Sequence, residues 1–283
     1  MITIINQKIK KEFGMKRIFL AVVMLSFFAT SFAQDLSDGL KAKNAGNEAY
    51  RNKNYVEAIE NWESYFNSGE EGADTDANTK KLYRRSFKYA ASDFMKSKNY
   101  SKAYEYFTEY REKGGEQAKS DGKTAYYMAY CSNKMDKDDL ALSHYQEAVE
   151  LGYREDVSML YMANIYRKNG NEEKMVSILE KALNEYPKSK YRSKMLSMLT
   201  TPMLKEAAKP FNQANELAKA ASTGDPNNYL ANMSKAVAKF KEAKPMFEKV
   251  LKIDPKNDQA KTYIDACNDN INSFNEYKDS LDN

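Results

Sequence analysis

The sequence of 283 residues is poor in residues that break helices and in residues that most often carry catalysis or hold metal ions. It contains 6 Pro, 11 Gly, 2 Cys and a single His, His144. Scarce Pro and Gly disfavour a sheet fold, and the mean hydropathy of -0.77 is typical of a soluble helical chain. One His disfavours a Ser-His-Asp triad and a His-based zinc site. We therefore expect an all-α protein that is not an enzyme, with no catalytic residues, no metal site and no cofactor.

The two cysteines, Cys131 and Cys267, are too few for a fold held together by disulfides, because such folds are small and dense in Cys. Each lies in a stretch with helical character. We expect two buried thiols that do not pair. A disulfide between them stays open as an alternative, since an oxidising compartment would permit one.

The segment MKRIFLAVVMLSFFATSFAQ, residues 15–34, has the order of charges and apolar residues that is typical of a secretory signal peptide. Two cations precede an apolar run over 18–28, and Ser31-Phe32-Ala33 forms a cleavage signal. The run is shorter than the roughly 18 to 20 apolar residues that span a bilayer. We therefore predict a cleaved signal peptide over residues 1–33 and no integral membrane span in the mature chain.

Export follows from this prediction, with the periplasm, the cell envelope or the extracellular space as the location. No Cys follows the apolar run, so a lipid anchor is not expected. Met15 begins a complete signal by itself, and residues 1–14 are therefore a candidate for sequence upstream of the true start.

The excess of positive charge belongs to this leader. Residues 1–33 hold five basic residues and one acidic residue, so that 39 of the 44 basic and 39 of the 40 acidic residues lie in the mature chain. The mature chain is therefore neutral, although the pI of the whole sequence is about 8.6. A neutral chain gives no electrostatic reason to expect nucleic acid or an anionic membrane as a partner.

One phrase occurs twice. RNKNYVEAIENW, residues 51–62, is echoed 45 residues later by KSKNYSKAYEYF, residues 96–107. Small or apolar residues mark the same point in four copies, at steps of 45, 38 and 34 residues: Ala58, Ala103, Ala141 and Met175. A small residue stands twelve positions before each mark, and a large apolar residue stands four positions after it. A fixed period of this length predicts stacked supersecondary units.

This repeating pattern of small and large residues resembles the tetratricopeptide repeat, a helix-turn-helix unit of about 34 residues. The best matches are NAGNEAYRNKNYVEAIENWESYF and MANIYRKNGNEEKMVSILEKALNEYP. The resemblance implies a right-handed α-solenoid with four units over 34–187. Degenerate units with longer helices follow over 188–255, and a capping helix over 256–283. In the degenerate part, Thr201-Pro202 predicts a helix start, and a second long helix is expected from about Tyr229 to Ile253.

The loop DTDANT places Asp74, Asp76 and Asn78 at the alternate spacing of a calcium loop. The Gly and the bidentate Glu that such a loop needs are replaced by Thr79 and Arg85. We expect a solvated acidic loop and no metal ion.

The resemblance implies a concave groove that binds extended peptides or partner helices. Lys43 and Asn47 hold two positions of a clamp for terminal carboxylates, whereas Tyr89 and Tyr127 replace two others. Basic residues recur near the end of each first helix, accompanied by polar and aromatic residues on the inner face: Arg51, Lys96, Lys134 and Lys168 with Tyr50, Tyr126, Tyr130 and Asn164. Two interpretations stay open, since these cations either complement the helix dipole or contact a partner peptide.

The resemblance thus implies a non-enzymatic scaffold for protein-protein interaction in the cell envelope, with a protein or peptide partner and no small-molecule substrate. The alternative is an adaptor or assembly factor for an outer-membrane, secretion or polysaccharide-handling machine.

Overall fold

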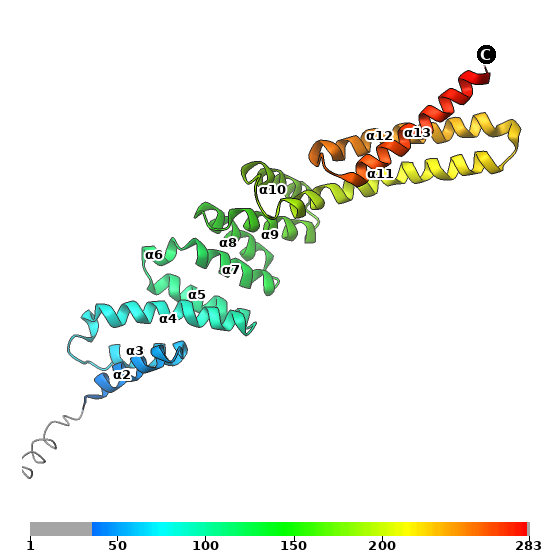
Figure 1. Ribbon diagram of the computed structural model, residues 1–283. Helices are drawn as coiled ribbons and strands as arrows, with labels where there is room; N and C mark the ends of the chain where they lie inside the picture. Colours follow the sequence, from blue (N-terminus) through cyan, green and yellow to red (C-terminus); the bar gives the residue numbers. More distant parts are fainter. Residues whose placement is uncertain (1–35, 282–283) are drawn as a thin grey trace, which may run out of the picture. The chain divides into compact units, whose positions relative to one another are not determined.

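A computed structural model describes residues 36–281 (Figure 1). The predicted signal peptide lies outside the described residues, so export stays a prediction. Within 36–281 the chain forms helices joined by turns and contains no strand, which confirms the predicted all-α class. The chain divides into two compact units, the first ending at Lys119 and the second beginning at Ser120. The predicted domain bounds at residues 187 and 255 stay a prediction.

The first unit consists of two helical hairpins and a short final helix (Figure 1). Helix α2 packs on α3, α3 on α4, and α4 on α5. The bounds are α2 Asp38–Arg51, α3 Tyr55–Phe66, η1 Ala73–Thr75, α4 Ala77–Lys96, α5 Tyr100–Lys113 and α6 Glu116–Lys119. The core between the hairpins contains Trp62, Ile59 and Phe87, which meet small residues of the facing helices.

The second unit also begins with pairs of helices joined by short turns, and it ends in three longer helices (Figure 1). Each helix packs on the next along the chain. The bounds are α7 Gly122–Lys134, α8 Asp138–Glu150, α9 Glu155–Lys168, α10 Glu172–Glu185, α11 Arg192–Thr223, η2 Pro226–Asn228, α12 Tyr229–Ile253 and α13 Asp258–Leu281. No helix among the described residues is both long and apolar enough to cross a membrane.

The turn inside each hairpin repeats with the period that the sequence predicts. One residue per turn has a positive φ, at steps of 45, 38 and 34 residues: Lys53, Lys98, Asp136 and Gly170. The next amide donates back across the turn in all four copies, for example from Asn54 N to Ala49 O at 2.8 Å and from Asn171 N to Tyr166 O at 2.8 Å. A positive φ with this backbone bond ends a helix and reverses the chain. The structure therefore has a helix-turn-helix hairpin at each of these four turns.

Small residues of the repeat allow close contact between helices. Gly46 of α2 faces Trp62 of α3, and a Cβ atom added at Gly46 would lie 2.6 Å from the indole Cδ1 and Nε1. Ala58 and Ala103, which mark the first two copies of the repeat, are fully buried. A larger side chain at any of these points would push two helices apart, because cores of this density leave no room for added atoms.

The predicted helix start at Thr201-Pro202 is wrong. Helix α11 runs without a break from Arg192 to Thr223 and holds Pro202 and Pro210 in its interior. Each proline removes one backbone hydrogen bond. Buried side chains pack on both sides of Pro202, Met198 in one core cluster and Phe211 in another, so tertiary packing outweighs the local break.

Two long helices follow α11 in the described part of the chain. Helix α12 spans Tyr229–Ile253 as expected, and α13 occupies the predicted capping segment. Tyr263 of α13 stacks on Phe247 of α12 with ring centroids 4.6 Å apart. Both thiols are buried and unpaired, as expected. Burial raises the pKa of Cys131 to about 12 and that of Cys267 to about 11.

Candidate functional site

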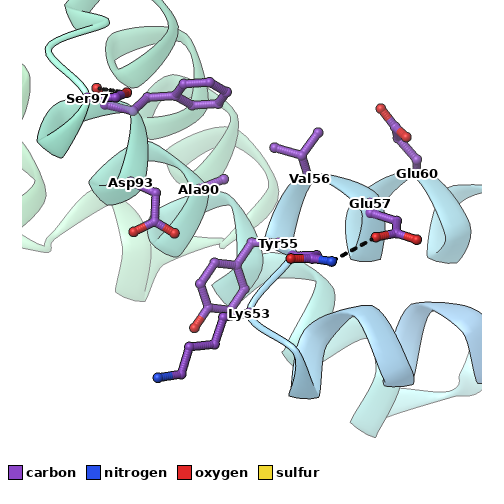
Figure 2. Close-up of a pocket in the computed structure, with 10 residues that line it drawn as sticks. Lys53, Tyr55, Val56, Glu57, Glu60, Ala90, Asp93 and Ser97 are labelled. Atoms are coloured by element: carbon purple, nitrogen blue, oxygen red, sulfur yellow. Dashed lines mark hydrogen bonds between the residues drawn. The ribbon is translucent and has the colours of Figure 1, made fainter.

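A hollow of about 490 Å³ lies between the start of α3 and the second half of α4 (Figure 2). The turn at Lys53 ends α2, so that the first residues of α3 form one wall. The other wall is one face of α4 together with its C-cap residue Ser97, and the contributing residues follow the helical spacing i, i+3, i+4, i+7: Ala90, Asp93, Phe94 and Ser97. The hairpin geometry therefore places both walls.

The hollow has apolar walls and an acidic rim. Val56, Ala90 and Phe94 supply apolar surface. Glu57 and Glu60 project from α3 and Asp93 projects from α4 (Figure 2). A group with an apolar body and a neighbouring positive charge would fit this arrangement.

The rim carboxylates differ in what they contact. Asn54 Nδ2 donates to Glu57 Oε2 at 3.1 Å, and Lys96 Nζ lies 2.6 Å from Asp93 Oδ1. Glu60 forms no ion pair within the described part of the chain. The rim therefore keeps a net negative charge near the apolar walls.

A cluster of tyrosines borders this hollow. Tyr50 of α2, Tyr55 of α3 and Tyr89 of α4 have ring centroids 4.9 to 6.4 Å apart. Arg85 Nη2 donates to the Tyr89 hydroxyl at 2.7 Å. Burial raises the pKa of Tyr50 and of Tyr55. Of these residues the sequence predicts only Tyr50 as a groove residue, and the structure places it partly in the wall, against Trp62 at 5.7 Å.

Lys43 is already engaged within the unit. Its Nζ lies 2.7 Å from Asp76 Oδ2 and 5.3 Å from the centre of the Tyr65 ring. Asp76 is also the N-cap of α4 and accepts from the Thr79 amide at 3.0 Å. Burial opposes ionisation of Asp76, but Lys43 and Thr79 outweigh burial, and the pKa of Asp76 lies well below its ordinary value. Lys43 therefore joins α2 to the cap of α4, while Asn47 lies half-buried on α2.

The predicted basic column lies at helix ends. The four cations are the last residues of their helices and are exposed: Arg51 of α2, Lys96 of α4, Lys134 of α7 and Lys168 of α9. Lys168 Nζ contacts Asp136 Oδ1 at 2.8 Å and Asp138 Oδ1 at 3.1 Å, both in the preceding hairpin. Lys134 Nζ lies 5.4 Å from the centre of the Tyr130 ring. These contacts favour the capping and bridging interpretation over an open groove.

Two further predicted groove residues of the second unit contact their own unit. Tyr126 is buried, with its ring 5.8 Å from that of Tyr145, so it lies in the core and not on an open surface. Burial raises the pKa of Tyr126 well above its ordinary range. Asn164 is half-buried and donates to the Leu160 carbonyl at 2.8 Å.

The sequence patterns did not predict the residues that form the hollow. Tyr55 and Val56 stand within the repeated segment and Phe94 stands just before its second copy, and that segment predicts stacked helices and not a binding surface. The spacing of 90, 93, 94 and 97 on one helix, and its place next to a turn, was the available signal. Within residues 36–281 no three metal-ligating side chains gather.

The tetratricopeptide repeat family matches residues 157–189, which form α9, α10 and the start of the following turn. This is the fourth predicted unit. The match covers one repeat of the chain, and the other units are recognised from their helices and turns.

Several solved structures are similar to this chain at low identity. A TPR repeats protein from Bacteroides fragilis is 18% identical, with 82% of this chain and 99% of that chain covered and a TM-score of 0.43. The C-terminal part of a TPR repeat-containing protein from Cytophaga hutchinsonii is 18% identical, with 81% and 93% covered and a TM-score of 0.39. The TPR2AB domain of yeast Sti1, in a complex with pHSP90, is 18% identical, with 70% and 88% covered and a TM-score of 0.37. No curated protein matches the sequence.

Proposed function

We propose that the chain is a non-enzymatic scaffold for protein-protein interaction, and that the hollow between α3 and α4 receives an apolar side chain of an extended segment from a protein partner. The observation that carries the proposal is the lining of this hollow, where Val56, Ala90 and Phe94 offer apolar surface beneath an open mouth. Preformed apolar hollows with few polar groups at the edge are suited to hold such a side chain.

The charge at the rim defines the partner segment further. Glu57, Glu60 and Asp93 surround the mouth, against Lys53 and the partly neutralising Lys96. A segment with Lys or Arg beside its apolar anchor complements this rim. Rim charges of this kind act mainly on the rate of association and on the choice of partner.

The helical hairpins support a preformed surface. In a repeat array each unit is held by its neighbours, and binding needs little rearrangement of the backbone. The hollow lies within one hairpin pair of the first unit, whose turn and core residues fix both walls. Affinity is therefore expected to come from contact with existing surface.

Export to the cell envelope is part of the proposal and depends on residues 15–34 alone. N-terminal sequencing of the mature protein is expected to begin at Gln34. A start at Met1 or Met15 would overturn this part. An adaptor role for an outer-membrane, secretion or polysaccharide-handling machine stays a prediction, since no feature of the described residues favours it over the general scaffold.

Site-specific photo-crosslinking in intact cells tests the proposal. A photoreactive residue at Val56 lines the hollow, and one at Ser64, exposed on the same helix, serves as the control. We expect a defined partner band from position 56 and none from position 64. Equal crosslinking from both positions, or none from position 56, would contradict the proposed site.

A further inference from the structure

The first half of α4 carries five cations within nine residues, in the segment KKLYRRSFK over 80–88. Two of them are engaged locally: Lys80 Nζ donates to the Asp74 carbonyl at 2.6 Å, and Lys88 Nζ lies 5.2 Å from the centre of the Tyr110 ring. The other three line a hollow of about 350 Å³ together with residues of α5, α6 and the turn between them: Lys81, Arg84 and Arg85.

Among the described residues, no carboxylate lines this hollow. Lys81 and Arg84 are exposed and form no ion pair with any described residue, and the hydrogen-bond partner of Arg85 is the neutral Tyr89 hydroxyl. Two acidic residues of the adjoining helices pair with lysines of their own helix, Glu109 with Lys113 at 3.2 Å and Glu116 with Lys119 at 3.0 Å. Three positive charges therefore line one opening, and the described lining holds no negative charge.

This charge arrangement is unfavourable for the helix itself. Like charges at spacings of three and four residues repel each other, as do Lys81, Arg84 and Arg85. The helix dipole acts within the first and the last turn, so it favours Lys96 at the end of α4 and does not stabilise the three cations of the hollow. Helix stability thus explains the cation at the end of α4 and does not explain those near its start.

The opposite wall of the hollow is fixed in place. A Cβ atom on Gly114 would collide with the Cβ of Ala118, so glycine permits the tight approach of α6 to α5. Arg111 Nη2 donates to the Lys119 carbonyl at 2.9 Å and fastens the end of α6. Gln117 adds an exposed amide to the wall. The cations therefore face a defined surface.

We propose that this hollow binds the carboxylates of an acidic segment of a protein partner, with Arg84 and Arg85 as the principal contacts and Lys81 as a further positive charge. Guanidinium groups present paired donors that match a carboxylate. The proposal rests on the scaffold function only in that the anion comes from a protein. The site shares no lining residue with the hollow between α3 and α4.

Binding of a fluorescein-labelled hexaglutamate peptide to the full chain tests the proposal by fluorescence anisotropy at about 20 mM NaCl. The variant K81Q/R84Q removes the two cations that have no other contact, and K181Q/K194Q removes two exposed lysines of the second unit as a charge-matched control. We expect binding by the wild-type chain, a loss of about tenfold or more in K81Q/R84Q, and a change within about twofold in the control.

Equal losses in the two variants, or no binding by the wild-type chain, would overturn the proposal. The variant R84K keeps the charge and removes the fork of donors, so weaker binding is expected, and wild-type affinity would overturn bidentate recognition. Because hexaglutamate contains no apolar anchor, failure here is distinct from failure of the scaffold proposal.

Discussion

Lys43 Nζ lies 2.7 Å from Asp76 Oδ2, and the other oxygen of this carboxylate accepts the Thr79 amide at 3.0 Å. One side chain thus caps α4 and fastens α2 to it. We expect D76A to lower the free energy of unfolding by about 1 to 3 kcal/mol, because the variant loses a helix cap and leaves Lys43 unpaired. Urea unfolding followed by circular dichroism measures the change. D74A, in the same loop, is the control, and an equal loss in D74A would contradict the role of Asp76.

The effect of D76A is expected to depend on pH. The folded-state pKa of Asp76 lies below its ordinary value, near 3.9 in the unfolded chain. The carboxylate therefore contributes its full stability above about pH 4 and loses it as pH falls through the folded pKa. The difference between wild type and D76A should be constant from pH 7 to about 5 and shrink below about pH 4. A difference that grows on acidification would contradict the lowered pKa of Asp76 in the folded chain.

Replacement of Gly46 by Ala tests the close helix contact. Alanine is favoured over glycine inside a helix by about 1 kcal/mol, yet the new methyl group would meet the Trp62 ring at 2.6 Å. We expect a net loss of about 1 to 3 kcal/mol, and partial recovery in G46A/W62F because a smaller ring leaves space. A45G, at an exposed position of the same helix, should lose about 1 kcal/mol from propensity alone. A stabilised G46A would show that the contact is looser than described.

Removal of Pro202 tests the continuous helix α11. Proline in a helix interior costs about 3 kcal/mol relative to alanine, and P202A restores the missing amide. We expect P202A to raise the free energy of unfolding by about 1 to 3 kcal/mol in urea titrations. P187A, beyond the end of α10, should change it by less than about 0.5 kcal/mol. A destabilised P202A would indicate that α11 is interrupted near residue 202.

The basic residues at helix ends are expected to serve stability and not partner capture. Lys168 contacts Asp136 and Asp138, and Lys96 contacts Asp93. The variant K96Q/K134Q/K168Q should therefore melt at a lower temperature and crosslink its partner from position 56 as efficiently as wild type. Loss of crosslinking with an unchanged melting temperature would assign these lysines to the binding surface instead.

Local signals in the sequence were sufficient to predict the position of each repeat. The steps of 45, 38 and 34 residues between the marks recur as the steps between Lys53, Lys98, Asp136 and Gly170 at the turns, because each turn fixes the position of its small contact residue. The bounds of α12 were also predicted, since polar turn residues flank a long apolar pattern. The predicted helix start at Thr201-Pro202 was wrong, because the effect of Pro202 on the helix depends on packing by residues far along the chain.

The functional surface was harder to predict, because it too depends on contacts between residues that are distant in the sequence. Lys43 fitted a clamp by its position in the frame, but its actual partner, Asp76, stands in an inserted loop that the frame does not describe. Tyr126 was assigned to a groove, whereas rings from α8 and α9 cover it. Phe94 and Val56 form a hollow only after a turn brings two helices together. In each of these cases, contacts between helices determine whether the side chain is available to a partner.

The most direct test of the central claim is the affinity of the segment captured by crosslinking, measured by isothermal titration calorimetry with the full chain. V56R places a charged side chain in the hollow between α3 and α4, and S64R adds the same charge at an exposed point of α3. We expect V56R to weaken binding by about tenfold or more and S64R to stay within about twofold of wild type. Wild-type affinity in V56R would contradict this expectation.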